Sequence, residues 1–90
     1  MSYTVRRFED TPNPNAVKCV LDRAVVAPGA GSRSFRNAQD AASDPLAAAL
    51  FATPGVTNIL MCDNWISVGK SPDAPWARVK AGVTKALAKA

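Results

Sequence analysis

SDPLAAALFATPGVTNILMCDNWISVGK, the stretch from Ser43 to Lys70, predicts a helix followed by a β-hairpin. Asp44 suits the N-cap position, and Pro45 then takes the first helical position, where its missing N–H leaves no hydrogen bond unmade. Pro54-Gly55 ends the helix, because proline and glycine both favour a helix stop. The expected apolar face follows helical spacing and consists of Leu46, Ala49, Leu50 and Thr53.

Two β-prone runs flank Asp63-Asn64, and both of these residues tolerate the positive φ of a two-residue hairpin loop. The cross-strand pairs that this turn sets are Cys62 with Trp65, Met61 with Ile66, and Ile59 with Val68. The last two pairs then share one apolar face, whereas Asn58 and Ser67 lie on the other. We expect the apolar face to supply half of the core.

The composition is typical of one small globular domain. The chain has 90 residues, a net charge of +4 from 11 basic and 7 acidic residues, and a mean hydropathy of −0.03. The basic residues are dispersed, so a nucleic-acid partner is not expected. No apolar run approaches the roughly 18 residues of a transmembrane helix, and the first residues lack a signal-peptide pattern. The sequence therefore predicts a cytoplasmic protein without a membrane partner.

The residue types needed for several kinds of chemistry are missing. The chain has no histidine, which excludes histidine acid–base catalysis, catalytic triads and Cys/His zinc sites. None of its carboxylates are spaced to share one helix face beside a pocket-forming aromatic residue. We therefore predict no catalytic residue and no metal site. Cys19 and Cys62 are expected to be reduced thiols, buried or half-buried.

Two strands are predicted before the helix. Residues Tyr3–Phe8 form one β-prone run and Ala16–Leu21 form the next. The residues of the second run expected on the inner face are Val17, Cys19 and Leu21. Lys18 alternates onto the other face.

A proline-rich segment, Thr11-Pro12-Asn13-Pro14-Asn15, joins these two strands. Each proline keeps the preceding residue out of the helical region, and each asparagine can close an Asx-turn. The composition predicts a rigid, hydrogen-bond-rich turn. A partner-binding loop is the alternative, and the sequence leaves it open.

The segment between the second strand and the helix is the least determined. Its expected elements are a short strand at 24–26, a plain loop at 28–31 and a third strand at 34–36. Phe35 is expected to point inward. Asn37 followed by Asp40 forms a variant of the capping box, which predicts a short helical turn over residues 38–42.

The last helix is expected after Ser71-Pro72, with Asp73 as its N-cap and Pro75 in its first turn. The expected apolar stripe consists of Trp76, Val79, Val83, Ala86 and Leu87. The cations expected to face water are Arg78, Lys85 and Lys89.

The predicted order of elements, β-β-(β)-α-β-β-α, indicates an α+β fold. We expect a two-layer sandwich, with an antiparallel or mixed sheet of four to five strands and both main helices on one face. Leu60, Cys62 and Trp65 would then point to the open face. They could form an exposed apolar patch there or lie under the 22–34 loop, and we expect partial cover by that loop.

Four segments in this order resemble a known family. They are TPNPN before the strand with Lys18, DPLAAALFATPGVTNI, the hairpin ending at Lys70, and the helix start Asp73-x-x-Trp76. Within the second segment the matching residues are Pro45, Leu46, Ala47, Leu50, Phe51, Gly55 and Val56. With these segments in this order and spacing, the chain resembles the N-terminal domain of Nfu-type iron–sulfur cluster scaffold proteins, and the resemblance covers essentially residues 5 to 88.

The resemblance implies a small α+β domain associated with iron–sulfur cluster assembly, whose protein partner is an iron–sulfur scaffold or client protein. In that family a CxxC motif in a separate C-terminal domain holds the cluster. The sequence has no CxxC, and two thiolates cannot complete the four-ligand shell of a cluster within one subunit. We therefore expect a stand-alone domain, residues 1–90, that lacks the CxxC domain and binds no cofactor by itself.

Three classes of function remain open: an accessory interaction module in iron–sulfur protein maturation, an interaction domain repurposed for an unrelated partner, and an enzyme or direct metal binder. We favour the first, a protein that is not an enzyme. Because the helices are predicted to cover one sheet face, we expect recognition to use the other face, an edge or a loop. The candidate partner-binding residues are Thr11, Asn13, Asn15, Lys18 and Trp65.

Overall fold

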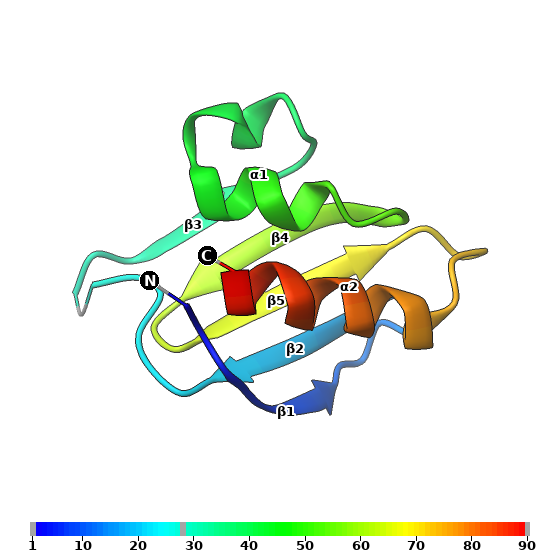
Figure 1. The fold of residues 1–90 in the computed structure, drawn as a ribbon, viewed down its shortest axis with the longest axis horizontal. Coiled ribbons are helices and arrows are strands. Elements are labelled where there is room, and N and C mark those ends of the chain that lie inside the picture. Colours follow the sequence, from blue (N-terminus) through cyan, green and yellow to red (C-terminus); the bar gives the residue numbers. More distant parts are fainter. Residues whose placement is uncertain (1, 28, 90) are drawn as a thin grey trace.

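The computed structural model describes residues 2–27 and 29–89, which form a five-stranded sheet with the helices on one face (Figure 1). The strands are β1 (Val5–Asp10), β2 (Ala16–Leu21), β3 (Ser32–Phe35), β4 (Val56–Cys62) and β5 (Trp65–Lys70). Their spatial order is β1-β2-β5-β4-β3, and all four neighbouring pairs are antiparallel. The helices are the 3₁₀ helix η1 (Asp40–Ser43), α1 (Pro45–Phe51) and α2 (Trp76–Lys89). The predicted two-layer α+β sandwich is confirmed.

The β4–β5 hairpin has the predicted register. Cys62 pairs with Trp65, Met61 with Ile66, and Ile59 with Val68. Of the two turn residues, Asp63 takes the positive φ, at 47°. A short polar side chain tolerates this left-handed conformation better than a branched one would.

The core lies between the sheet and the helices. The four inward residues of the hairpin are at most 2% exposed, and the predicted inward residues of β2 are at most 3% exposed. The helical side chains buried against them are Ala47, Leu50, Val79, Val83 and Leu87. The stripe predicted on α2 is therefore confirmed, but the face predicted on α1 is partly wrong. Leu50 and Thr53 are buried as predicted, and Ala47 is also fully buried, whereas Leu46 and Ala49 are only half-buried.

Asp44 holds the start of α1 in the predicted way. Its Oδ1 atom accepts hydrogen bonds from the N–H groups of Leu46 and Ala47, both at 3.1 Å. Its Oδ2 atom lies 2.8 Å from Nη1 of Arg33 on the edge strand β3. One carboxylate thus caps the helix and ties it to the sheet, and the pattern of the sequence did not predict the second contact.

Three boundaries before α1 differ from prediction. The first strand is shifted two residues onward, to Val5–Asp10. The third strand covers Ser32–Phe35, and the helical turn is a 3₁₀ helix starting at Asp40, whose N–H donates to Asn37 Oδ1 at 2.8 Å. Such ends are set by tertiary pairing and not by local propensity.

Residues 24–26 form no strand, which corrects the prediction. The N–H groups of Val25 and Val26 donate to the carbonyl of Asp63, at 2.7 and 3.2 Å. Val26 joins the core, so this loop closes over the hairpin turn. Pro28, in the predicted 28–31 loop, lies outside the described residues.

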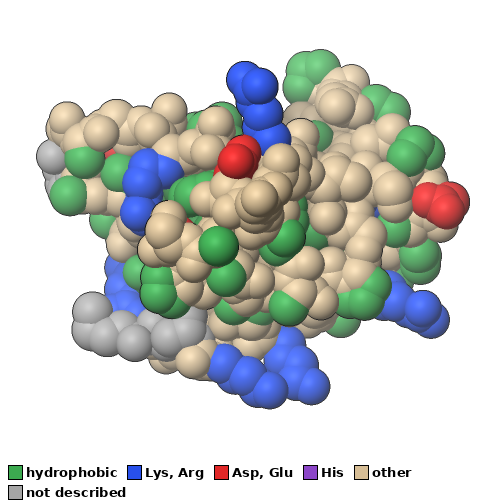
Figure 2. Space-filling view, turned by 90° about the horizontal axis from the view of Figure 1, so that it is seen from above, with side chains coloured by type: hydrophobic (Ala, Val, Ile, Leu, Met, Phe, Trp, Pro, Cys, Tyr) green, Lys and Arg blue, Asp and Glu red, His purple; other side chains and the backbone are tan. Residues whose placement is uncertain are grey.

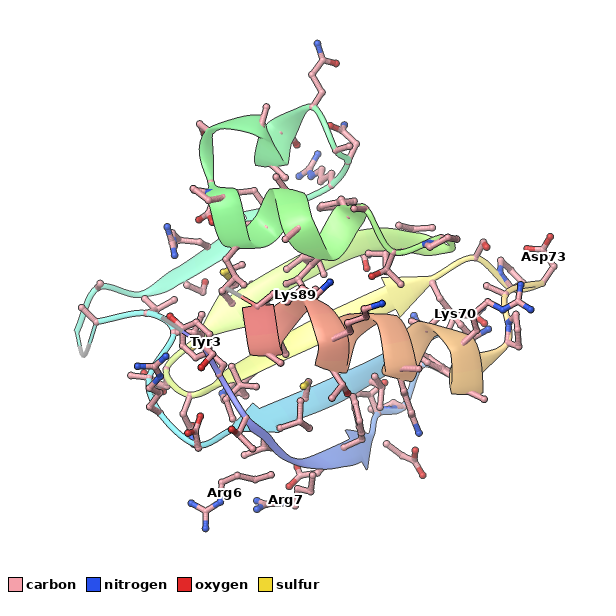
Figure 3. All side chains as sticks on the ribbon, in the orientation of Figure 1. Tyr3, Arg6, Arg7, Lys70, Asp73 and Lys89 are labelled. Carbon is pink, nitrogen blue, oxygen red and sulfur yellow. The ribbon has the colours of Figure 1, made fainter. Side chains whose placement is uncertain are left out.

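Asp73 does not cap α2. The helix begins at Trp76, and the Pro75 carbonyl accepts from the N–H groups of Arg78 and Val79 at 3.2 and 3.1 Å. Asp73 belongs to a turn closed by the Ala74 N–H on the Ser71 carbonyl, and it lies at the outer tip of the loop (Figure 3).

Candidate functional site

The Thr11–Asn15 turn is internally hydrogen-bonded, as predicted. The Thr11 hydroxyl lies 2.9 Å from the carbonyl oxygens of Asn13 and Ala16, and it accepts from the Asn13 N–H at 3.2 Å. The Asn15 N–H donates to Asn13 Oδ1 at 2.9 Å, which closes an Asx-turn. These bonds fix the turn from within.

Two residues distant in sequence fix the same turn from outside. The Lys70 ammonium donates to Asn15 Oδ1 at 3.3 Å, and Trp76 Nε1 donates to the Pro14 carbonyl at 3.1 Å. The Lys70 N–H also donates to the Asn15 carbonyl at 2.8 Å. Figure 3 shows Lys70 at the end of β5, beside the start of α2. Thr11 and Asn15 are therefore turn-forming residues, with their side chains engaged by the fold.

Lys18 and Trp65 meet on the sheet face opposite the helices, here called the open face. Lys18 Nζ lies 4.8 Å from the centroid of the Trp65 ring, within the range of a cation–π contact. Both side chains are half-buried. The sequence thus placed this pair on the correct face, although their contact was not predicted.

The same face has an apolar element beside this pair. Val20, the cross-strand partner of Trp65, is 6% exposed, although it points away from the core. Leu60 and Cys62, predicted to share this face, are half-buried. These residues are therefore partly exposed on the open face, and their cover by the 22–34 loop stays a prediction.

A hollow of about 340 Å³ adjoins the pair, with Asn13 on its rim. Its lining on the open face includes Asn13, Ser34, Arg36, Asn58, Leu60 and Ser67. Ser67 is the cross-strand partner of Lys18, so the hollow is continuous with the cation–aromatic pair. Lys18, Trp65 and this hollow are called the open-face site below.

Gly69 shapes the floor of the open-face site. A Cβ atom at this position would come within 1.7 Å of Asn58 Oδ1, so the carboxamide of Asn58 can lie across the sheet only because residue 69 is glycine. The alternation of strand residues could have assigned Asn58 and Leu60 to this face. The contributions of Ser34 and Arg36 depended on the pairing of β3 with β4, which the sequence left undetermined.

The two cysteines lie on opposite faces of the sheet. Cys19 pairs with the core residue Ile66, whereas Cys62 pairs with Trp65 on the open face. Burial raises the pKa of the Cys19 thiol from 9.0 to about 12. Within residues 2–27 and 29–89, no group of three or more His, Cys, Asp or Glu side chains could hold a metal ion. Because they lie on opposite faces of the sheet, Cys19 and Cys62 are not placed to bind one metal centre together within a single copy of the described chain.

On the face shown in Figure 2, basic side chains project at several places around the outline, with hydrophobic side chains scattered between them. Arg6 and Arg7 point outward at the β1 edge in Figure 3, where Arg7 Nε lies 2.6 Å from Glu9 Oε2. Within the described parts of the chain, no helix has the length and apolar character needed to cross a membrane.

Comparison with known proteins identifies one family, the one that the sequence resembles, over nearly the whole chain. The family model for the Nfu/NifU scaffold protein N terminus matches residues 5–90. A NifU-like protein of Schizosaccharomyces pombe is 36% identical over 74 residues, covering 82% of this chain and 28% of the relative. NifU-like protein 5, mitochondrial, of Arabidopsis thaliana is 35% identical over 72 residues, covering 80% of this chain and 26% of the relative. The chain thus spans about a quarter of the length of these curated relatives.

Solved structures show the same fold. The crystal structure of a Staphylococcus aureus protein superposes with a TM-score of 0.78 at 27% identity, covering 92% of this chain and 96% of that one. A NifU-like protein of Saccharomyces cerevisiae, solved by NMR, gives a TM-score of 0.81 at 23% identity, covering 96% of this chain and 77% of that one. With the family model matched over nearly all of its residues, the chain belongs to the Nfu/NifU N-terminal scaffold family.

Proposed function

We propose that this chain is a non-catalytic protein-interaction module of iron–sulfur cluster assembly that carries no cluster ligands of its own. The observation that carries the proposal is the open-face site. Both helices pack on the opposite side of the sheet, which leaves a cation–aromatic pair and a hollow on an uncovered face. Relatives named as NifU-like proteins and an iron–sulfur cluster scaffold homolog supply the context.

The partner-binding role divides among the five candidate residues. Lys18, Trp65 and Asn13 would contact the partner, because they border the hollow or the pair beside it. Thr11 and Asn15 would act indirectly, by holding Asn13 in place. Aromatic residues and cations on a rigid support are typical of small, well-defined interfaces.

The partner is proposed to be an iron–sulfur scaffold or client protein, and Lys18→Glu tests this. The purified chain would be titrated with a recombinant Nfu-type CxxC domain and, separately, with an iron–sulfur client protein. We expect roughly a tenfold loss of affinity in Lys18→Glu, since reversing an interface charge introduces repulsion. Arg6→Glu, a matched strand cation on the β1 edge, is the control and should bind normally.

Equal binding by Lys18→Glu and the native chain would remove the open-face site from the proposal. Failure of both probes to bind the native chain would favour the alternative, an interaction domain repurposed for an unrelated partner.

The proposed absence of cluster ligands has its own test. Anaerobic titration with iron and sulfide should produce no visible cluster absorption, and a stoichiometric chromophore would contradict it. The cytoplasmic location stays a prediction, to be checked with a fluorescent fusion.

A further inference from the structure

A second surface lies on the opposite side of the molecule, in a groove between α1 and α2. The groove has a volume of about 660 Å³. The small residues that line it include Ala49 and Ala52 on the α1 side and Ala81 and Gly82 on α2. A Cβ atom at Gly82 would come within 2.5 Å of Thr53 Cγ2, so the missing side chain lets the end of α1 pack closely on α2. The floor of the groove is therefore formed by small, mostly apolar residues.

Three exposed cations line this groove along α2. Arg78, Lys85 and Lys89 are separated by seven and four residues, which places them on one helix face. With a rise of 1.5 Å per residue, they span roughly 16 Å, or about three helical turns. Figure 3 shows Lys89 in the last turn of α2.

These cations have no carboxylate partner in the described part of the chain. The ion pairs there join Arg7 with Glu9 and Arg33 with Asp44, and the groove lining contains no acidic residue. The groove therefore combines an apolar floor with a row of cations that no described carboxylate pairs with. A partner that complements it must be apolar at its centre and acidic along its side.

We infer that this groove binds an acidic amphipathic helix of a partner protein. One wall of the groove is α2, and the other is the end of α1 with the turn at residues 52–54 that follows it, so neither wall is a strand edge that an extended peptide could pair with. An extended peptide laid there would leave its own N–H and C=O groups unpaired against apolar side chains, whereas a helix satisfies them internally. The small residues also allow a third helix to approach closely.

The spacing of the cations favours a protein helix over a free anion. A single anionic group can meet one of the three cations, while a helix with acidic residues three, four or seven positions apart can meet all of them. Because the groove and the open-face site lie on opposite sides of the sheet, one chain could bind both partners at once.

The experiment uses a synthetic helical peptide of about 15 residues, or about 22 Å. It carries alanine and leucine on one face and glutamate along the flank. Its matched control has lysine in place of every glutamate. Each peptide would be titrated into the native chain, with amide chemical shifts recorded by NMR. We expect the acidic peptide to bind and to shift the amides of residues 49–54 and 78–89, and the basic peptide not to bind.

Charge swapping tests the assignment of the groove. The double variant Lys85→Glu with Lys89→Glu should bind the acidic peptide with an affinity lower by roughly tenfold or more, and it should now bind the basic peptide. The double variant Lys85→Gln with Lys89→Gln keeps helix-forming residues. Its affinity for the acidic peptide should fall, but it should not bind the basic peptide. Arg6→Glu, on the β1 edge, should behave as the native chain.

Three outcomes would overturn the inference. They are no binding of the acidic peptide to the folded native chain, equal weakening by Arg6→Glu, and shifts confined to the open face. Binding of phosphatidylglycerol-containing vesicles without binding of the peptide would also overturn it and assign the groove to a membrane surface. Since none of the groove variants alters Lys18 or Trp65, this inference and the proposed function fail independently.

Discussion

The Lys70 ammonium donates to the side-chain carbonyl of Asn15, 55 residues away, at 3.3 Å. Lys70 is only 8% exposed. Its remaining acceptors are the carbonyl oxygens of Ser71 and Pro72, at 3.2 and 3.5 Å, and its Nζ lies 5.2 Å from the Trp76 ring centroid. A buried cation is thus satisfied by neutral groups, and it joins the Thr11–Asn15 turn to the connection before α2.

Replacing Lys70 by methionine should destabilise the domain. The variant keeps an apolar stem of similar length but leaves the half-buried Asn15 Oδ1 without its donor, which should cost on the order of 1 kcal/mol. Chemical denaturation measures the free energy of unfolding. The control Lys85→Met changes an exposed helical lysine and should stay within about 0.5 kcal/mol of the native chain. An equally stable Lys70→Met would show that the turn does not depend on this contact.

The double role of Asp44 can be separated by substitution. Asp44→Asn keeps an oxygen that can accept from Leu46 and Ala47 but loses the charge paired with Arg33. Asp44→Ala loses both and should cost about 0.5–2 kcal/mol for the cap alone. We therefore expect the melting temperature to be highest for the native chain, lower for Asp44→Asn and lowest for Asp44→Ala. If Asp44→Asn is as unstable as Asp44→Ala, the ion pair with Arg33 contributes more to stability than the helix cap does.

The fold was predictable where the determining contacts are local. The β4–β5 hairpin follows from a two-residue turn and strand alternation, which together fix its register. The Arg33–Asp44 ion pair and the Lys70–Asn15 bond join residues far apart in sequence, and no periodicity encodes them.

The candidate site was predictable to a smaller extent. Alternation placed Lys18 and Trp65 on the open face, but their contact depends on β2 pairing with β5, across a long sequence separation. Asn15 was a candidate for partner contact because of its composition. Its carbonyl and side chain are instead bound by Lys70, a relation visible only after folding.

Leu50 should be the main anchor of α1. Its side chain is fully buried against the sheet, so Leu50→Ala leaves a cavity and should cost about 2–5 kcal/mol. Denaturant midpoints with an unchanged slope would measure this loss. Ala48→Gly, at an exposed position of the same helix, should cost about 1 kcal/mol through helix propensity alone. A smaller loss for Leu50→Ala than for Ala48→Gly would contradict the packing of α1.

The Cys19 thiol gives the stability a pH dependence with a defined sign. Its pKa is about 12 in the folded state and 9.0 in the reference state, because burial disfavours the thiolate. The folded state therefore retains a proton that the unfolded state loses. The stabilisation is fully present below pH 9 and declines progressively as the pH rises from about 9 to 12.

Cys19→Ala removes this titration and, by deleting one buried heavy atom, should cost on the order of 1 kcal/mol at neutral pH. Unfolding measured from pH 7 to 10.5 should show the native chain losing its advantage over Cys19→Ala above about pH 9. Thiol labelling offers a second readout, since half-buried Cys62 should react much faster than Cys19. Parallel pH curves for the two proteins would show that Cys19 does not titrate as described.

The open-face site makes its own prediction through Asn13 and Lys18. Asn13 borders the hollow and Lys18 lies against Trp65, so changing both to alanine removes two polar contacts from one surface. If these residues serve docking, the double variant should bind the CxxC domain or client protein at least tenfold more weakly, while its melting temperature stays within a few degrees of that of the native chain.

Asn13 also accepts from the Asn15 N–H, and losing that bond alone should cost about 1 kcal/mol. Asn13→Asp keeps this acceptor and serves as the matched control for the turn. A double variant that unfolds early while Asn13→Asp does not would identify Asn13 as scaffold, and normal binding by the double variant would place the docking site elsewhere.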